Sequence, residues 1–364
     1  MKKFLLPAVA LTALIVSGAP DNSNTAGTVN SAPAAKTEKA SKKASVKAKK
    51  RKSVKVAKEI TYLCSFDNTQ QPALLLAAKS KEPRPLFVTL HTWSSDYRQC
   101  QNYAQRLQKL DVYMIAPNFR GKNTVGNKLS MGSDAAVSDI LDAVKYMQKN
   151  YNIDPNRIYL IGGSGGGFMS LLTSSRSREI WAAVSSWCPI SDLTAWHAYY
   201  DAMPKAKKSY GTHIEKNIGN PKTDAKAKAE AAHRSPVNTL EGAAYPLDIS
   251  HGVFDRTVPV EHAIWAFNKV AAPKDRFSDA EIKAIKTIIK TKKTPAGFPE
   301  VSEKFGSAKI YVRRVSGNVR INIIHAGHSI MPGIGIQWLL KQQKGKPADF
   351  SDIKSKEKSS ALGR

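Results

Sequence analysis

From about residue 59 onward, short apolar runs alternate with stretches in which apolar residues recur at helical spacing. Runs of four to eight residues bounded by polar or turn-forming residues are typical of buried strands. Such runs predict strands at 59–66, 73–78, 86–90, 112–116, 157–161, 181–187, 247–250, 309–315 and 321–324. Apolar residues at 137, 140, 141, 144 and 147 predict a helix capped by Ser133 or Asp134, and 331–341 predicts a closing helix.

Strands that alternate with helices over this length predict one α/β domain at 59–345, with a mostly parallel, twisted sheet covered by helices on both faces. Residues 272–308 do not fit the alternation. Ser278 and Glu281 form a capping-box pattern, and isoleucines at 282, 285, 288 and 289 form an apolar stripe opposite lysines. We expect an inserted helical segment there, as a lid or a flank of the site.

The chain ends differ from this domain in composition. Residues 1–19 combine two lysines, an apolar stretch from Phe4 to Val16 and a small-residue exit, which predicts a secretory signal peptide; an uncleaved anchor is the alternative. We therefore expect an exported bacterial protein, periplasmic or secreted. Residues 20–58 predict a disordered basic linker, and 346–364 a basic C-terminal tail.

The charge balance is strongly basic, with 56 Lys and Arg against 29 Asp and Glu among 364 residues. Residues 36–58 hold eleven of the basic residues and one Glu. This block predicts either a solubilising linker or a contact with an anionic cell wall or polysaccharide. No basic helix or aromatic-studded strand accompanies it, so no sequence-specific nucleic-acid binding is expected. No apolar run has the roughly 18–20 residues of a membrane span, so we expect none once the signal is removed.

The strongest chemical signal is the run Gly162–Gly167, which follows the strand 157–161 and contains the pattern Gly-x-Ser-x-Gly around Ser164. A nucleophile between a strand and a helix needs a tight, strained turn, and glycines two positions on either side remove the steric clash. A phosphate-binding loop is the alternative, but no Lys-Ser or Lys-Thr follows the run. Ser164 is therefore the candidate nucleophile.

A serine needs a base and an acid, which follow it in chain order in this architecture. Asp255 lies in the loop after the strand 247–250, where α/β sites are built; a turn-forming Asp is the alternative. His328 lies on a glycine-containing loop after the last strand, and we prefer it as the base to His325 and His262. His251 and His91 are expected to bond loop backbone.

The other site residues are expected from position. An oxyanion hole should combine the N–H of Gly165 with that of Thr92 or Trp93, in the loop after the strand 86–90. Arg98 and Arg120, with Trp93, are candidates to shape a pocket for an acidic or sugar-bearing substrate. Arg120 alternatively anchors its own loop.

These motifs together resemble the catalytic domain of the prolyl oligopeptidase-like branch of the α/β-hydrolase superfamily, over about residues 70–342. The resemblance rests on His91 after its strand, on the run around Ser164, on the segment from His251 to Pro259, and on Gly327-His328. It implies the α/β-hydrolase fold, with Ser164 as nucleophile, Asp255 as acid and His328 as base. This chain departs from the family in having His91-Thr92-Trp93 in place of a His-Gly-Gly oxyanion loop.

Oligopeptidases of this branch carry a gating propeller, and fewer than 30 residues separate the linker from the strand 86–90. The sequence therefore favours a stand-alone serine hydrolase that cleaves carboxylic esters, including acylated carbohydrate, through an acyl-enzyme. The alternatives are a serine-type peptidase of the same family and a non-catalytic surface protein that binds anionic glycans. No cofactor and no metal is implied.

Overall fold

A computed structural model describes residues 55–204, 209–242 and 244–353. The expected signal peptide and nearly all of the expected linker lie outside these residues, as does 354–364 of the expected tail. The described residues belong to one compact unit, Ser53–Arg364. No helix among them combines the length and apolarity that crossing a membrane requires.

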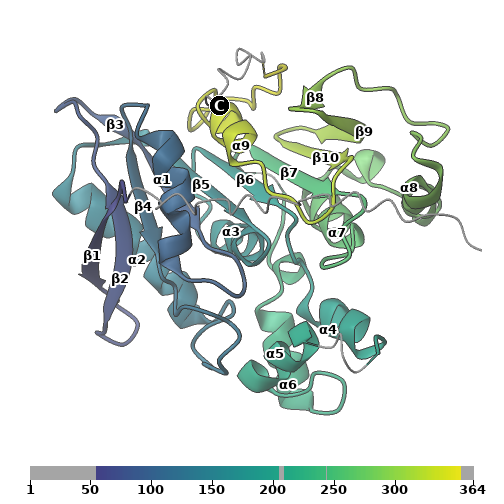
Figure 1. The fold of residues 1–364 in the computed structure, drawn as a ribbon, viewed down its shortest axis with the longest axis horizontal. Coiled ribbons are helices and arrows are strands. Elements are labelled where there is room, and N and C mark those ends of the chain that lie inside the picture. Colours follow the sequence, from purple (N-terminus) through teal and green to yellow (C-terminus); the bar gives the residue numbers. More distant parts are fainter. Residues whose placement is uncertain (1–54, 205–208, 243, 354–364) are drawn as a thin grey trace, which may run out of the picture. The chain divides into compact units, whose positions relative to one another are not determined.

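In the described part of the chain, ten strands form a sheet in the order β1-β2-β4-β3-β5-β6-β7-β10-β9-β8 (Figure 1). The central strands β4, β3, β5, β6, β7 and β10 are parallel to one another, and β2 and β9, which flank them, pair antiparallel with β4 and β10. The strands are β1 Lys58–Leu63, β2 Gln70–Leu76, β3 Arg84–Leu90, β4 Tyr113–Pro117, β5 Ile153–Gly163, β6 Ala183–Trp187, β7 Leu247–Gly252, β8 Lys304–Phe305, β9 Ala308–Ser316 and β10 Val319–Ile324.

Helices cover both faces of this sheet, because side chains of the central strands alternate between two cores. In β3, Leu86, Val88 and Leu90 pack in the core that includes α2, α3 and α7, whereas Phe87 packs in the core that includes α1 and α9. The helices are α1 Gln101–Leu107, α2 Asp134–Asn150, α3 Gly165–Arg176, α4 Leu193–Asp201, α5 Ser209–Ile218, α6 Ala225–His233, α7 Glu261–Val270, α8 Asp279–Thr291 and α9 Pro332–Leu339. The expected mostly parallel α/β architecture is confirmed.

The expected inserted helix is α8, and the capping box of Ser278 and Glu281 is formed. Ile285 and Ile288 are buried in the core. Lys286 of α8 pairs with Glu261 of α7, and Glu281 pairs with Arg314 of β9. These two ion pairs attach α8 to α7 and β9. The inserted helix is therefore a flank of the sheet.

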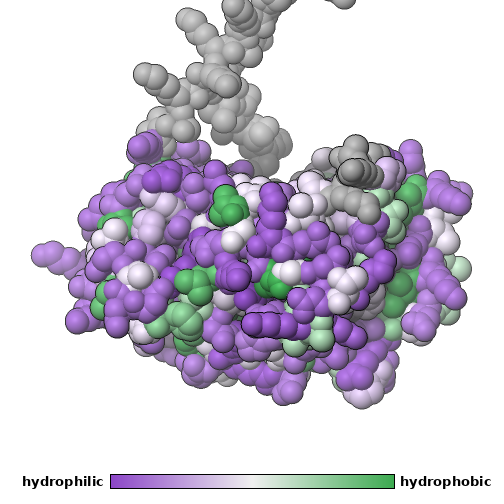
Figure 2. Space-filling model, turned by 90° about the horizontal axis from the view of Figure 1, so that it is seen from below, coloured by the Kyte–Doolittle hydropathy of each residue, from purple (hydrophilic) through white to green (hydrophobic). Residues whose placement is uncertain are grey.

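A second helical insertion, between β6 and β7, was not singled out in the sequence. It contains α4, α5 and α6, which lie together below the sheet in Figure 1. Asp192 and Asp224 cap α4 and α6 by accepting backbone N–H groups. Seen from this side, the surface is mostly hydrophilic, with hydrophobic residues in small separate patches (Figure 2).

Residues 346–353, which the sequence assigns to a basic tail, pack against the domain. The Phe350 ring stacks on Trp338 of α9 with centroids 5.9 Å apart. The guanidinium of Arg320, buried and paired with Asp248, lies 5.0 Å from the Phe350 ring centroid. These apolar and cation–π contacts explain why the chain continues along the domain beyond residue 345.

Candidate active site

Ser164 occupies a strained turn between β5 and α3. Its φ of 58° and ψ of −121° lie where a non-glycine residue is rarely found. The Ser164 N–H donates to the carbonyl of Trp187, the last residue of the neighbouring strand β6, at 2.8 Å, which holds the turn against the sheet. A Cβ on Gly162 would lie 2.3 Å from the Gly166 carbonyl oxygen, so the close approach within this turn requires glycine.

The loop after β3 passes directly over the N-terminus of α3. A Cβ on Gly165 would lie 2.4 Å from the Trp93 backbone nitrogen. The absence of that Cβ therefore lets the backbone of Trp93 approach the first residue of the helix. Stabilisation of an oxyanion requires backbone N–H groups next to the nucleophile, and Trp93 and Gly165 bring two of them together there.

The two candidate oxyanion donors in that loop, the backbone N–H groups of Thr92 and Trp93, differ in whether a protein group already accepts their hydrogen bond. The Thr92 N–H donates to Gln99 Oε1 at 2.8 Å. The Trp93 N–H has no hydrogen-bond partner among the residues that the structure describes. Of the two, only Trp93 therefore has a backbone donor available for a substrate.

Asp255 and His328 are brought together from the ends of β7 and β10. His328 Nδ1 lies 2.6 Å from Asp255 Oδ2, and the Asp255 side chain is fully buried. Asp255 Oδ1 accepts the N–H groups of Thr257 and Val258 at 2.8 and 3.0 Å. Burial raises the pKa of Asp255, but hydrogen bonds from His251 and His328 outweigh it and hold the pKa well below its usual range. The carboxylate is thus ionised and fixed in orientation.

The loop that carries His328 lies beside the turn that carries Ser164. A Cβ on Gly163 would lie 2.3 Å from Ile330 Cδ1, and Cys188 Sγ donates to the Ser329 carbonyl at 3.3 Å. No hydrogen bond joins the Ser164 hydroxyl to His328 within the described part of the chain. Such bonds are often long without substrate and shorten in the reacting complex.

The other histidines considered in the sequence bond groups other than Ser164, and one of them, His251, also contacts Asp255. His325 Nδ1 bonds the Tyr311 hydroxyl at 2.5 Å. His262 Nδ1 lies 3.3 Å from the Ser191 nitrogen, and burial lowers its pKa to about 3. His251 bonds the Val258 carbonyl, and His91 lies between the carbonyls of Thr92 and Asn118. His328 makes the shorter contact with Asp255 Oδ2, at 2.6 Å through Nδ1, and the buried His251 Nε2 lies 3.4 Å from the same oxygen.

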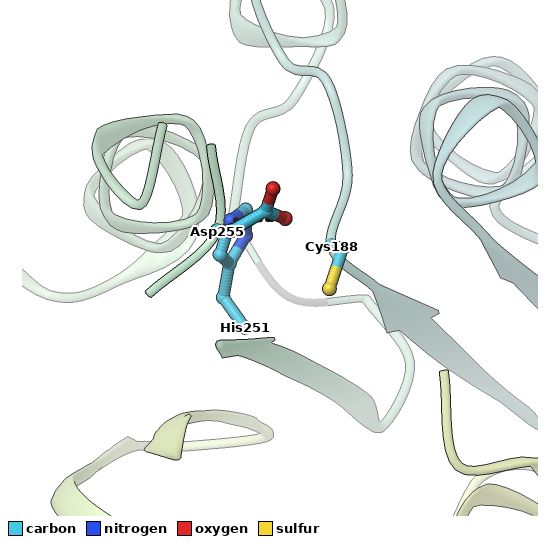
Figure 3. Close-up of side chains that lie close together, drawn as sticks. All are labelled: Cys188, His251 and Asp255. Atoms are coloured by element: carbon cyan, nitrogen blue, oxygen red, sulfur yellow. Dashed lines mark ion pairs between the residues drawn. The ribbon is translucent and has the colours of Figure 1, made fainter. Parts of the chain in front are cut away.

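Cys188, His251 and Asp255 form a buried cluster of metal-ligand types, with ligand atoms within 4.8 Å of one another (Figure 3). Burial raises the pKa of the Cys188 thiol to about 12, so the thiol is protonated. Asp255 already accepts from two backbone groups and His328. A cation needs a thiolate and free carboxylate oxygens, so this donor set suits a hydrogen-bonded support for Asp255 better than a metal centre.

The two arginines expected to bind substrate are engaged elsewhere, which corrects that expectation. Every guanidinium nitrogen of Arg120 donates to Asp67 or Asp139, and its side chain is 6% exposed. Arg98 pairs with Glu59 and Asp96, and its guanidinium lies over the Tyr97 ring. Arg120 therefore anchors its own loop, the alternative named above, whereas Arg98 is exposed and held by surface ion pairs.

Replacing Arg120 with methionine is expected to lower the free energy of unfolding by about 3 kcal/mol, because it leaves the buried Asp139 carboxylate unpaired. KM should stay within about twofold of the parent, since the guanidinium contacts only protein groups. Urea unfolding and steady-state kinetics measure the two quantities. The exposed Arg98→Met is the matched control and should leave stability almost unchanged. A raised KM with parental stability would return Arg120 to the substrate site.

Three aromatic residues of α4, absent from the sequence expectations, hold the loop of Asp255. Trp196 Nε1 and the Tyr200 hydroxyl both donate to the Thr257 carbonyl at 2.9 Å, and the Tyr199 hydroxyl donates to the Arg256 carbonyl at 3.0 Å. The Trp196 ring also contacts Trp93, with centroids 4.8 Å apart. Their spacing of three and four residues, after the cap Asp192, was the signal that could have placed them on one helical face.

Part of the chain matches a known protein family. Residues 98–283, about half of the chain, match the model of the prolyl oligopeptidase family. That range contains Ser164 and Asp255 and ends before His328.

Two curated relatives are peptidases by name. The chain is 25% identical to dipeptidyl aminopeptidase BIII of Pseudoxanthomonas mexicana, over 50% of this chain and 27% of that protein. It is 28% identical to the uncharacterized peptidase YtmA of Bacillus subtilis, over 41% of this chain and 54% of that protein. The chain thus matches about a quarter and about half of their lengths. Oligopeptidase B from Leishmania major is a structural neighbour at 14% identity and a TM-score of 0.48, covering 61% of this chain and 31% of that one.

Proposed function

Because this chain belongs to the prolyl oligopeptidase family and has the α/β-hydrolase fold, we propose that it is a serine peptidase. The observation that carries the proposal is the contact of 2.6 Å between His328 and Asp255, beside the strained turn of Ser164, within a chain of this family. The comparisons favour the peptidase, named above as the alternative, over the ester hydrolase expected first.

The mechanism that this geometry supports is acyl transfer. Ser164 Oγ attacks the carbonyl carbon of the scissile bond while His328 Nε2 takes the hydroxyl proton. Asp255 holds Nδ1–H of the ring, which keeps Nε2 free to accept that proton. His328 then gives the proton to the departing amine, which leaves an acyl group on Ser164. A water molecule, deprotonated by His328, releases the acyl group and restores the serine.

The oxyanion that forms in each step needs two donors. We assign the N–H groups of Trp93 and Gly165, because the Thr92 N–H is bonded to Gln99. The Trp93 nitrogen lies 2.4 Å from the position that a Cβ on Gly165 would occupy, and this close approach supports a single site for both donors. Donors that are already oriented stabilise the developing charge by about 2.7–4 kcal/mol each in enzymes of this kind.

A matched panel of substrates tests peptidase against esterase. Purified protein is assayed on aminoacyl 4-nitroanilides and short peptides, and in parallel on acetylated sugars. We expect release of amines with kcat on the order of 1–100 s⁻¹ for the best amide, and no measurable deacetylation. Acetate release from the sugars without cleavage of any amide would overturn the peptidase and support the ester hydrolase. Ser164→Ala is the control for both activities.

A further inference from the structure

A cavity of about 360 Å³ lies beside the nucleophile, between α1 and the loop that follows β10. Gly163, Thr92 and Ile330 line it. Gly163 directly precedes Ser164, Thr92 directly precedes Trp93, and Ile330 follows His328 by two residues. The cavity therefore borders the three segments that carry the nucleophile, the oxyanion donor and the base, and its volume is in the range of ligand pockets.

The lining of this cavity carries positive charge and no negative charge. Arg106 of α1 is the charged side chain in its lining, which includes the amides of Gln99 and Asn102 and no Asp or Glu. An adjoining cavity of about 420 Å³ shares Arg106, Ile330 and Pro332, adds Lys304 and also includes no acidic residue. Among the described residues, no carboxylate pairs with Arg106, in contrast to Arg98 and Arg120.

The position of the cavity relative to His328 indicates which part of a substrate would lie in it. The imidazole gives its proton to the departing group, so that group leaves on the side of the loop that carries His328 and Ile330. We propose that this cavity, here called the Arg106 pocket, binds a carboxylate on the leaving-group side of the substrate. This carboxylate belongs either to an acidic side chain or to the free C-terminus of a short peptide. The proposal rests on the serine-peptidase function and adds its substrate class.

Three dipeptides that differ only in charge test the proposal as analogues of the leaving group. Glycyl-asparagine amide has no carboxylate, glycyl-asparagine has a terminal carboxylate, and glycyl-aspartate α-amide has a side-chain carboxylate; all three have the same N-terminal amine. Each is titrated against the rate at which a fluorophosphonate labels Ser164. We expect a carboxylate dipeptide to halve the labelling rate at about tenfold lower concentration than glycyl-asparagine amide, and Arg106→Gln to remove that difference.

Arg98→Gln is the matched control, because Arg98 is an exposed arginine close in sequence that pairs with Glu59; it should keep the difference. If only one carboxylate dipeptide protects Ser164, the pocket recognises that kind of carboxylate, either a C-terminal or a side-chain one. If both protect, the pocket recognises both kinds. Equal potency of all three dipeptides, or a difference that survives Arg106→Gln, would overturn the pocket.

The failure of the proposed function looks different from the failure of the pocket. If the fluorophosphonate does not label Ser164, the serine-hydrolase chemistry is wrong. In that case the same dipeptides are titrated against the Ser164→Ala protein by calorimetry, which tests the pocket without any reaction. Carboxylate-selective binding there that is lost in Ser164→Ala/Arg106→Gln supports the pocket, and its absence overturns it.

Discussion

Replacing Ser164 with alanine is expected to lower kcat by about 10⁶-fold and to abolish labelling by a fluorophosphonate. The remaining methyl group cannot attack a carbonyl, so no acyl-enzyme forms. The turn should persist, because it is held by the Ser164 N–H and by Gly162 rather than by the hydroxyl. Rates on the best amide substrate, labelling, and the melting temperature measure the effect.

The matched control is Ser175→Ala, on the same helix. The Ser175 hydroxyl donates to the Leu172 carbonyl and contacts Thr239, away from the turn of Ser164. This variant should keep labelling and turnover near the parental level. Mapping the label by peptide analysis to a serine other than Ser164, or full activity in Ser164→Ala, would refute the nucleophile assignment.

Replacing Asp255 with asparagine is expected to lower kcat by about 10⁴-fold while the protein stays folded. The amide oxygen can still accept the N–H groups of Thr257 and Val258. The amide NH₂ would then face His328 Nδ1 and donate to it, which places the ring proton on Nε2. A ring with a protonated Nε2 cannot take the proton of Ser164.

Asp142→Asn is the control for this change. Asp142 is a buried carboxylate on α2 that accepts hydrogen bonds from Ser65 and from Lys145 of the same helix. It should leave kcat within about threefold of the parent, since its partners lie outside the site. The pH profile adds a second measurement. Because the pKa of Asp255 is held well below its usual range, its protonation should not cause the loss of parental activity between about pH 7 and pH 5. An Asp255→Asn protein with parental kcat would show that Asp255 is only a turn residue.

Two expectations from the sequence stay predictions. The signal peptide at 1–19, and all but residues 55–58 of the block 36–58 expected to contact an anionic wall or polysaccharide, lie outside the residues that the structure describes. Deleting 36–54, which leaves Ala57 and β1 in place, and measuring whether retention on heparin is lost tests the second of them.

The sequence by itself determined the features that depend on neighbours in the chain. Apolar runs predicted the central strands because a strand buried on both faces must be apolar throughout. The glycines around Ser164 predicted its turn because the steric clash they avoid lies within five residues. Each of the three residues Ser164, Asp255 and His328 follows a strand of a parallel sheet. Because the carboxyl ends of parallel strands lie at the same edge, the sequence predicted all three at that edge.

Only the tertiary structure decided which groups are left free for a substrate, because that depends on partners far away in the chain. Gln99 occupies the Thr92 N–H, and Asp67 and Asp139 occupy Arg120, whereas no carboxylate reaches Arg106 in the described residues. Likewise, α4 holds the loop of Asp255 across some 57–61 residues of sequence. A local pattern shows which donors and charges a segment carries. Whether each is already paired is decided by the packing of the whole domain.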